Sequence, residues 1–285
     1  MAGRRNRSAG RGARRGFRRR AAVVTALVSA LVVAIFLLVF TARGRALGRR
    51  MPFYDRLQRM LFGGPKVPEA DAYGIDVSRY QGDIRWDEVC LIPFNVTTRR
   101  QGADDTSAAV SIGFVFAKAT EGADYQDPCI EANRRGVRST GALFGAYHVM
   151  TMANAEAQAD NFISHSGLRK GDMVPVIDLE EALLGDYGVI AVRKVLASVA
   201  KRLKNHYGKR PVIYASQSYA AKLLDGEGFD GYPLWIARYS VAEPPEGADV
   251  WQFSENGQIP GISVPVDLNA LYATRFRLSS YIIAK

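Results

Sequence analysis

Histidine and cysteine are scarce in this chain, whose 285 residues include three His and two Cys. His148, His165 and His206 have no spacing typical of a ligand cluster, so we expect no metal site and no cofactor. Cys90 and Cys129 would form one disulfide in an oxidising compartment, or remain two buried thiols. The sequence leaves both possibilities open.

Acidic residues are almost absent from the first 66 positions, where 16 Lys and Arg accompany a single acid, Asp55. The remaining residues include 22 basic and 27 acidic ones, so the net charge of +10 belongs to the N-terminal segment. Phosphate binding needs basic residues on the fold itself, which argues against nucleic acid as a partner of the folded domain.

Residues 21–42 contain no charge and are long enough to cross a hydrocarbon core about 30 Å thick. Nine Arg precede them, which favours a cytoplasmic N-terminus. We therefore expect a basic cytoplasmic tail at 1–20, a single transmembrane anchor at 21–42 and a juxtamembrane connector at 43–72. The folded domain, 73–285, would lie outside the cytoplasm. A cleaved signal peptide is the alternative, but no clean A-x-A site follows Phe40.

Short β-type runs recur after the connector, and segments able to form helices separate the first five. This alternation predicts an α/β fold, a closed and mostly parallel TIM-like barrel of the form (β/α)5(β)3, irregular in its last three strands. The expected strands are 73–78, 112–119, 143–150, 174–180, 211–216, 234–239, 249–253 and 266–271. The expected helices are 130–139, 153–166, 189–207 and 219–224.

The fourth run, Val174–Ile177, is apolar and ends in carboxylates two positions apart, Asp178 and Glu180. On a strand these two side chains share a face, whereas Glu181 points the other way. Solvated charge at a strand end is one interpretation. Acid/base chemistry on a glycosidic bond is the other, because it requires two neighbouring carboxylates.

Other polar and aromatic residues are expected at the same rim, where such barrels hold their chemistry. If the barrel closes, Asp76 on the first strand approaches Asp267 on the eighth, although either acid could instead cap a turn. Lys118 and Glu121 would contact substrate or pair with each other. Aromatic residues at the rim would stack on sugar rings or pack in the core. The remaining candidates are Tyr147, His148, Trp235, Tyr239, Trp251 and Gln252.

The domain resembles the lysozyme-type glycoside hydrolases of family 25. The resemblance rests on successive motifs in family order between about 73 and 272. They are Gly74-Ile75-Asp76-Val77-Ser78 with Gln81-Gly82, Lys118-Ala119-Thr120-Glu121-Gly122, Tyr147-His148, Asp178-Leu179-Glu180, Trp235-Ile236-Ala237-Arg238-Tyr239, Trp251-Gln252 and Asp267-Leu268-Asn269.

The resemblance implies cleavage of the β-1,4 bond between N-acetylmuramic acid and N-acetylglucosamine in peptidoglycan glycan strands. By the same resemblance Glu180 is the general acid/base, Asp178 the carboxylate that stabilises charge or orients the acetamido group, and Asp76 and Asp267 shape the pocket. Of two adjacent acids the drier one keeps its proton, so we expect Asp178 to be the ionised partner. Substrate would contact the residues named above, Tyr147, Lys118, Glu121, Trp235, Tyr239 and Gln252.

Two other functions remain open. They are a chitinase-like or glucosaminidase activity, and a catalytically inactive glycan-binding protein. Retaining, inverting and substrate-assisted mechanisms also stay open. The polar segment 91–108 is longer than the family pattern expects.

Overall fold

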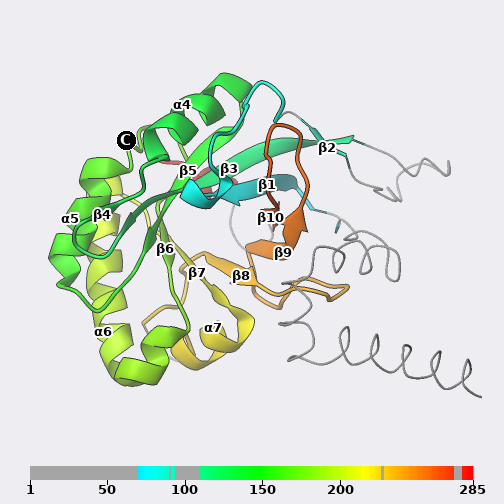
Figure 1. Ribbon diagram of the computed structural model, residues 1–285. Helices are drawn as coiled ribbons and strands as arrows, with labels where there is room; N and C mark the ends of the chain where they lie inside the picture. The colour runs from blue at the N-terminus through cyan, green and yellow to red at the C-terminus, as the bar shows by residue number, and fades with distance from the viewer. Residues whose placement is uncertain are drawn as a thin grey trace, which may run out of the picture. The chain divides into compact units, whose positions relative to one another are not determined.

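Eight strands close into a barrel in the part of the chain that the structure, a computed structural model, describes (Figure 1). This part comprises residues 68, 70–89, 91–93, 109–225, 228–272 and 278–284. The strands around the ring are β1 (Ala72–Val77), β10 (Val266–Leu271), β9 (Val250–Gly257), β8 (Leu234–Ala237), β7 (Val212–Ser216), β6 (Val176–Asp178), β5 (Leu143–Val149) and β3 (Ala109–Glu121). A parallel pairing of β1 with β3 closes the ring and confirms the predicted barrel.

Strand direction explains the irregular final third of the barrel. Parallel pairing runs from β1 through β3, β5, β6, β7 and β8 to β9. β10 runs against both of its neighbours, β9 and β1. The first residues of β10 therefore lie at the same rim as the last residues of the other strands.

Helices cover the outside of the barrel where the connections are long enough (Figure 1). They are α4 (Ile130–Thr140), α5 (Ala155–His165), α6 (Ala182–Tyr207) and α7 (Gln217–Leu223). α6 changes direction at Gly188, which has a φ of 76° and a ψ of 163°, values that few other residues adopt.

The expectation of a full β/α unit after the first strand was wrong for the described residues. β1 is followed by a single 3-10 turn, η1 (Arg79–Gln81), and then by β2 (Leu91–Pro93), which pairs antiparallel with the start of β3. The longer β3 continues into a small hairpin with β4 (Tyr125–Gln126), and the chain ends in a second 3-10 helix, η2 (Leu278–Tyr281). The remainder of the long segment, 94–108, lies outside the described residues.

Large aromatic side chains fill the barrel, and glycines on the neighbouring strands give them room. A Cβ atom at Gly145 would lie 2.4 Å from the Phe116 ring, and one at Gly74 would lie 2.4 Å from Phe114. Phe116 in turn stacks on Trp235, with the ring centroids 4.7 Å apart. These buried rings form the floor beneath the C-terminal rim.

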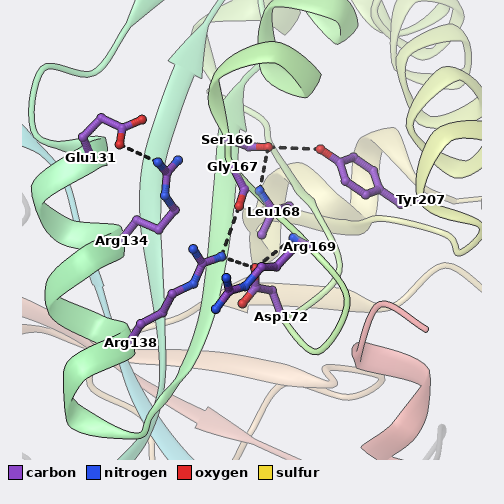
Figure 2. Close-up of polar contacts among 9 residues, drawn as sticks. All are labelled: Glu131, Arg134, Arg138, Ser166, Gly167, Leu168, Arg169, Asp172 and Tyr207. Carbon is purple, nitrogen blue, oxygen red and sulfur yellow. Dashed lines mark hydrogen bonds and ion pairs between the residues drawn. The ribbon is translucent and has the colours of Figure 1, made fainter. Parts of the chain in front are cut away.

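A polar network at the opposite end fixes the loop between α5 and β6 (Figure 2). The guanidinium of Arg138, on α4, donates to the Gly167 carbonyl at 3.1 Å and to Asp172 at 2.5 Å. Ser166 bonds the Tyr207 hydroxyl of α6 at 3.0 Å. Because these contacts join α4 and α6 to the entrance of β6, they stabilise the strand whose other end carries Asp178.

Several sequence expectations fall on other parts of the chain. Among the described residues, no helix is long and apolar enough to cross a membrane. The predicted anchor at 21–42, the tail at 1–20 and nearly all of the connector at 43–72 lie outside those residues. Cys129 is partly buried and has no disulfide partner among the described residues, and Cys90 lies outside them.

Candidate active site

A pocket opens at the rim where the parallel strands end, and it brings together all four acids predicted from the sequence. Asp76 comes from β1, Asp178 and Glu180 from the end of β6, and Asp267 from the start of β10. The complete lining is Asp76, Tyr147, Asp178, Leu179, Glu180, Glu181, Tyr214, Ser216, Trp235, Gln252 and Asp267.

Asp178 is the last residue of β6, and the change to helix immediately after it corrects one expectation. Strand alternation stops at Asp178, because Glu181 already precedes the first turn of α6. Glu181 therefore does not point away: it lines the pocket and accepts hydrogen bonds from Ser216 and Ser218. These two hydroxyl donors lower the pKa of Glu181.

Asp76 and Asp267 face each other across the antiparallel pair of β1 and β10. Oδ2 of Asp76 accepts hydrogen bonds from Gln252 Nε2 at 2.9 Å and from Asn269 Nδ2 at 2.7 Å. Burial raises the pKa of both carboxyls. The pKa of Asp267 rises to about 9, because the charge of Asp76 adds to the effect of burial. The two amide donors favour the charged form of Asp76, so the pair shares one proton that resides on Asp267.

Gln252 sets the orientation of Asp76. Its Oε1 accepts from the hydroxyls of Tyr214 at 2.9 Å and Tyr239 at 2.5 Å, which turns its Nε2 toward Asp76. Burial raises the pKa of both tyrosines, so both hydroxyls remain protonated donors. Tyr239, predicted to contact substrate, does not line the pocket and acts through Gln252.

Trp235 lines the pocket as part of its floor, with only 2 % of its surface exposed. Its indole N–H donates to Asn269 Oδ1 at 2.8 Å, which fixes the amide that holds Asp76. With one face stacked on Phe116, Trp235 fits the core interpretation better than the sugar-stacking one.

Asp178 is the acid most affected by its surroundings. Burial raises its pKa well above the usual range, and the charges of Glu180 and Asp76 raise it further. Its Oδ1 is buried and has no hydrogen-bond partner within the described residues. These surroundings favour the protonated form of Asp178 in the free pocket. The sequence had instead led us to expect an ionised partner beside Glu180, whose side chain is exposed.

Lys118 and Glu121 form an ion pair, with Nζ of Lys118 2.6 Å from Oε2 of Glu121. Mutual pairing was one of the two interpretations that the sequence allowed. Neither residue lines the pocket. The charge of Lys118 is nevertheless close enough to oppose the rise in the pKa of Asp178.

Tyr147 and His148 are adjacent on β5 and point to opposite faces. Tyr147 lines the pocket, and burial together with the charge of Asp76 raises its pKa. His148 bonds Thr120 at 2.8 Å and Gln158 of α5 at 3.2 Å, and burial lowers its pKa to about 4. His148 is therefore a neutral core residue.

Several pocket and supporting residues were missed as site residues by the sequence analysis. Asn269 carried a detectable signal, because it follows Asp267 by two positions and so shares its face of β10. Tyr214, Ser216 and Glu181 carried none, since their roles depend on how β7 packs beside β6. Within the described residues, no group of three or more His, Cys, Asp and Glu side chains is arranged to hold a metal ion.

Comparisons with known proteins agree with this geometry. The family model described as glycosyl hydrolases family 25 matches residues 75–262. Lysozyme M1 of Streptomyces globisporus is 30% identical over 246 residues, covering 78% of this chain and 77% of that protein. An uncharacterized protein of Escherichia coli K12, YegX, is 32% identical over 214 residues, covering 74% of this chain and 73% of that protein.

Solved structures show the same likeness. The bacterial lysozyme of Streptomyces coelicolor has a TM-score of 0.60 and 28% identity, with 74% of this chain and 96% of that one covered. A family 25 glycosyl hydrolase of Bacillus anthracis has a TM-score of 0.59 and 27% identity, with 72% and 91% covered.

Proposed function

Because the chain belongs to the glycosyl hydrolases of family 25, we propose that it is a lysozyme-like muramidase. It cleaves the β-1,4 bond between N-acetylmuramic acid and N-acetylglucosamine in peptidoglycan. The observation that carries this proposal is the convergence of Asp76, Asp178, Glu180 and Asp267 in one pocket. The lysozymes among its relatives support the choice of substrate.

Glu180 acts as the general acid and base. Its side chain is exposed at the pocket, so it can reach the glycosidic oxygen in the first step and a water molecule in the second. A residue that donates a proton and later accepts one needs both contacts.

Asp178 orients the substrate and stabilises the charge that develops on it. A buried oxygen without a partner costs about 1–3 kcal/mol, and an acetamido N–H of the substrate would satisfy Oδ1. The positive charge that develops on the sugar attracts the carboxylate and favours its ionised form. Asp178 must therefore pass its proton to solvent or to Glu180 before the glycosidic bond breaks.

Asp76 and Asp267 maintain negative charge on the side of the pocket formed by β1 and β10. Two amide donors fix Asp76, and the proton on Asp267 limits the repulsion between the two acids. Together they supply one net negative charge, which favours a cationic transition state.

Product analysis tests this function. The purified protein should release reducing ends from purified peptidoglycan, and borohydride reduction of the products should give muramitol. Glucosaminitol would indicate a glucosaminidase instead. The absence of turnover would leave only a glycan-binding role, and equal turnover by Glu180→Gln would exclude Glu180 as the general acid and base. Exposed Glu246→Gln is the matched control and should keep wild-type activity.

Localisation is a separate proposal that rests on the sequence. The uncharged segment 21–42 would anchor the protein, with the basic tail in the cytoplasm and the barrel on the peptidoglycan side. A reporter that is active only outside the cytoplasm, fused after Leu61, should be active. A reporter that works only in the cytoplasm and is active at this position would contradict the orientation.

A further inference from the structure

A cation lies at the same rim as the pocket, outside the residues that line it, and two aromatic rings hold it. Arg79 follows Asp76 by three residues and begins η1. Its Cζ lies 5.2 Å from the ring centroid of Tyr80 and 5.6 Å from that of Tyr125. Its backbone N–H donates to buried Asp127 at 3.1 Å, which fixes the base of the side chain.

No carboxylate forms an ion pair with the Arg79 side chain in the part of the chain that the structure describes. Arg85 and Arg138, by contrast, pair with Glu88 and Asp172 at 2.6 Å and 2.5 Å. The guanidinium lies over both rings and also hydrogen-bonds the Tyr80 side chain. Its fork of five N–H groups still leaves donors available for an anion. Arg79 is exposed to solvent, so an incoming anion can reach it.

Contacts between side chains connect this cation to the centre of the pocket. The Tyr125 ring also makes a cation–π contact with the ammonium group of Lys118, which lies 5.3 Å from the ring centroid. Lys118 in turn is close enough to act on the charge of Asp178. Because Lys118 already pairs with Glu121, Arg79 is the cation of this group that remains available to a substrate.

We propose that Arg79, positioned by Tyr80 and Tyr125, binds a carboxylate on the 3-substituent of the muramyl sugar. This inference rests on the proposed function. The sugar rings of peptidoglycan are uncharged, and the nearby carboxylates belong either to the 3-O-lactyl group or to the peptide stem attached to it. A stem extends by about 3.5 Å per residue, so it can reach from the pocket to the rim. Arginine suits such a group because its fork can donate two parallel hydrogen bonds to one carboxylate.

Kinetics with three soluble substrates separate the two sources. They are glycan fragments with intact stems, fragments stripped of stems by an amidase, which leaves a free lactyl carboxylate, and chitin oligomers, which have neither. For full-length Arg79→Gln we expect KM to rise about threefold to tenfold, with kcat unchanged, as for a charge contact at a rim. The wild-type KM should rise with salt, and Arg79→Gln should lose most of this dependence. Arg135→Gln, an exposed arginine on α4, is the control.

The outcomes are distinct. An effect confined to intact fragments assigns the carboxylate to the stem. An effect confined to stripped fragments assigns it to the lactyl group, whose carboxylate is free only after the stem is removed. Equal kinetics for Arg79→Gln and Arg135→Gln on both overturn the proposal, as does an equal loss on chitin oligomers. Tyr125→Leu should reproduce the rise in KM by releasing the guanidinium.

Binding measurements keep the proposal testable if the protein does not hydrolyse glycan. Calorimetry with the Glu180→Gln protein should show weaker binding of the same fragments when Arg79→Gln is added. Absence of turnover by the wild-type protein contradicts the proposed function alone, whereas unchanged binding contradicts the role of Arg79.

Discussion

The shared proton of Asp76 and Asp267 makes the stability of this protein depend on pH. The pKa of Asp267 is raised to about 9 in the folded state, from about 4 when unfolded. Between these values the folded state binds more protons than the unfolded state, so the free energy of unfolding falls as pH rises. The stability is fully present below about pH 4 and is lost as pH approaches 9.

Asp267→Asn removes this proton without changing the size of the side chain. If the folded protein alone held this proton from pH 5 to pH 8, its free energy of unfolding would fall by at most about 4 kcal/mol over that interval. Asp267 is partly exposed and relaxation screens its charge, so we expect about 2 kcal/mol. Between pH 5 and pH 8 the free energy of unfolding of the variant should therefore rise by about 2 kcal/mol relative to that of the wild type.

Denaturant unfolding at several pH values measures this difference. The three tryptophans are buried, so their fluorescence reports the transition. Acid-sensitive groups elsewhere, such as His148, affect both proteins equally and cancel in the difference. The control variant Glu246→Gln should show the same dependence of the free energy of unfolding on pH as the wild type. If Asp267→Asn and the wild type have the same pH dependence, the shared-proton argument is refuted.

Two further pairs of substitutions test the support of the pocket. Gln252→Leu removes the donor to Asp76 and the acceptor of two tyrosines, so kcat should fall at least about tenfold and stability by about 1–3 kcal/mol. Tyr239→Phe, which removes one donor, should cost less than about threefold in a reducing-end assay, and a loss equal to that of Gln252→Leu would contradict the proposed order of contacts. Gly145→Ala should lose about 1–3 kcal/mol in thermal unfolding, because its Cβ would meet Phe116 at 2.4 Å. Gly185→Ala, which meets nothing within 4 Å, should remain within about 1 kcal/mol of the wild type, and equal losses would exclude the steric cause.

The barrel could be predicted because its signals are local. Each strand has a short β-type run, and the acids at the ends of β1 and β6 follow apolar residues. The position of Asp267 also followed from closure, since the first and last strands of a ring must be neighbours. The prediction that failed, the direction of the Glu181 side chain, depended on the residue at which a strand ends. Glu181 was assigned to the wrong side because β6 ends at Asp178 rather than at Glu180.

Protonation could not be predicted from residue type alone. The sequence suggested an ionised Asp178, yet burial and neighbouring acids favour its neutral form. Trp235 and Lys118 were likewise ambiguous in the sequence. In the structure Trp235 bonds Asn269 and forms part of the floor of the pocket, whereas Lys118 pairs with Glu121 and lies outside the pocket.

The reduced products of peptidoglycan digestion test the central claim most directly. Muramitol ends released by the wild-type protein, and lost by at least about a thousandfold in Glu180→Gln, are the result expected of a general acid/base in the proposed pocket. Glucosaminitol ends, or undiminished release by Glu180→Gln, would contradict the assignment of a muramidase that acts through Glu180.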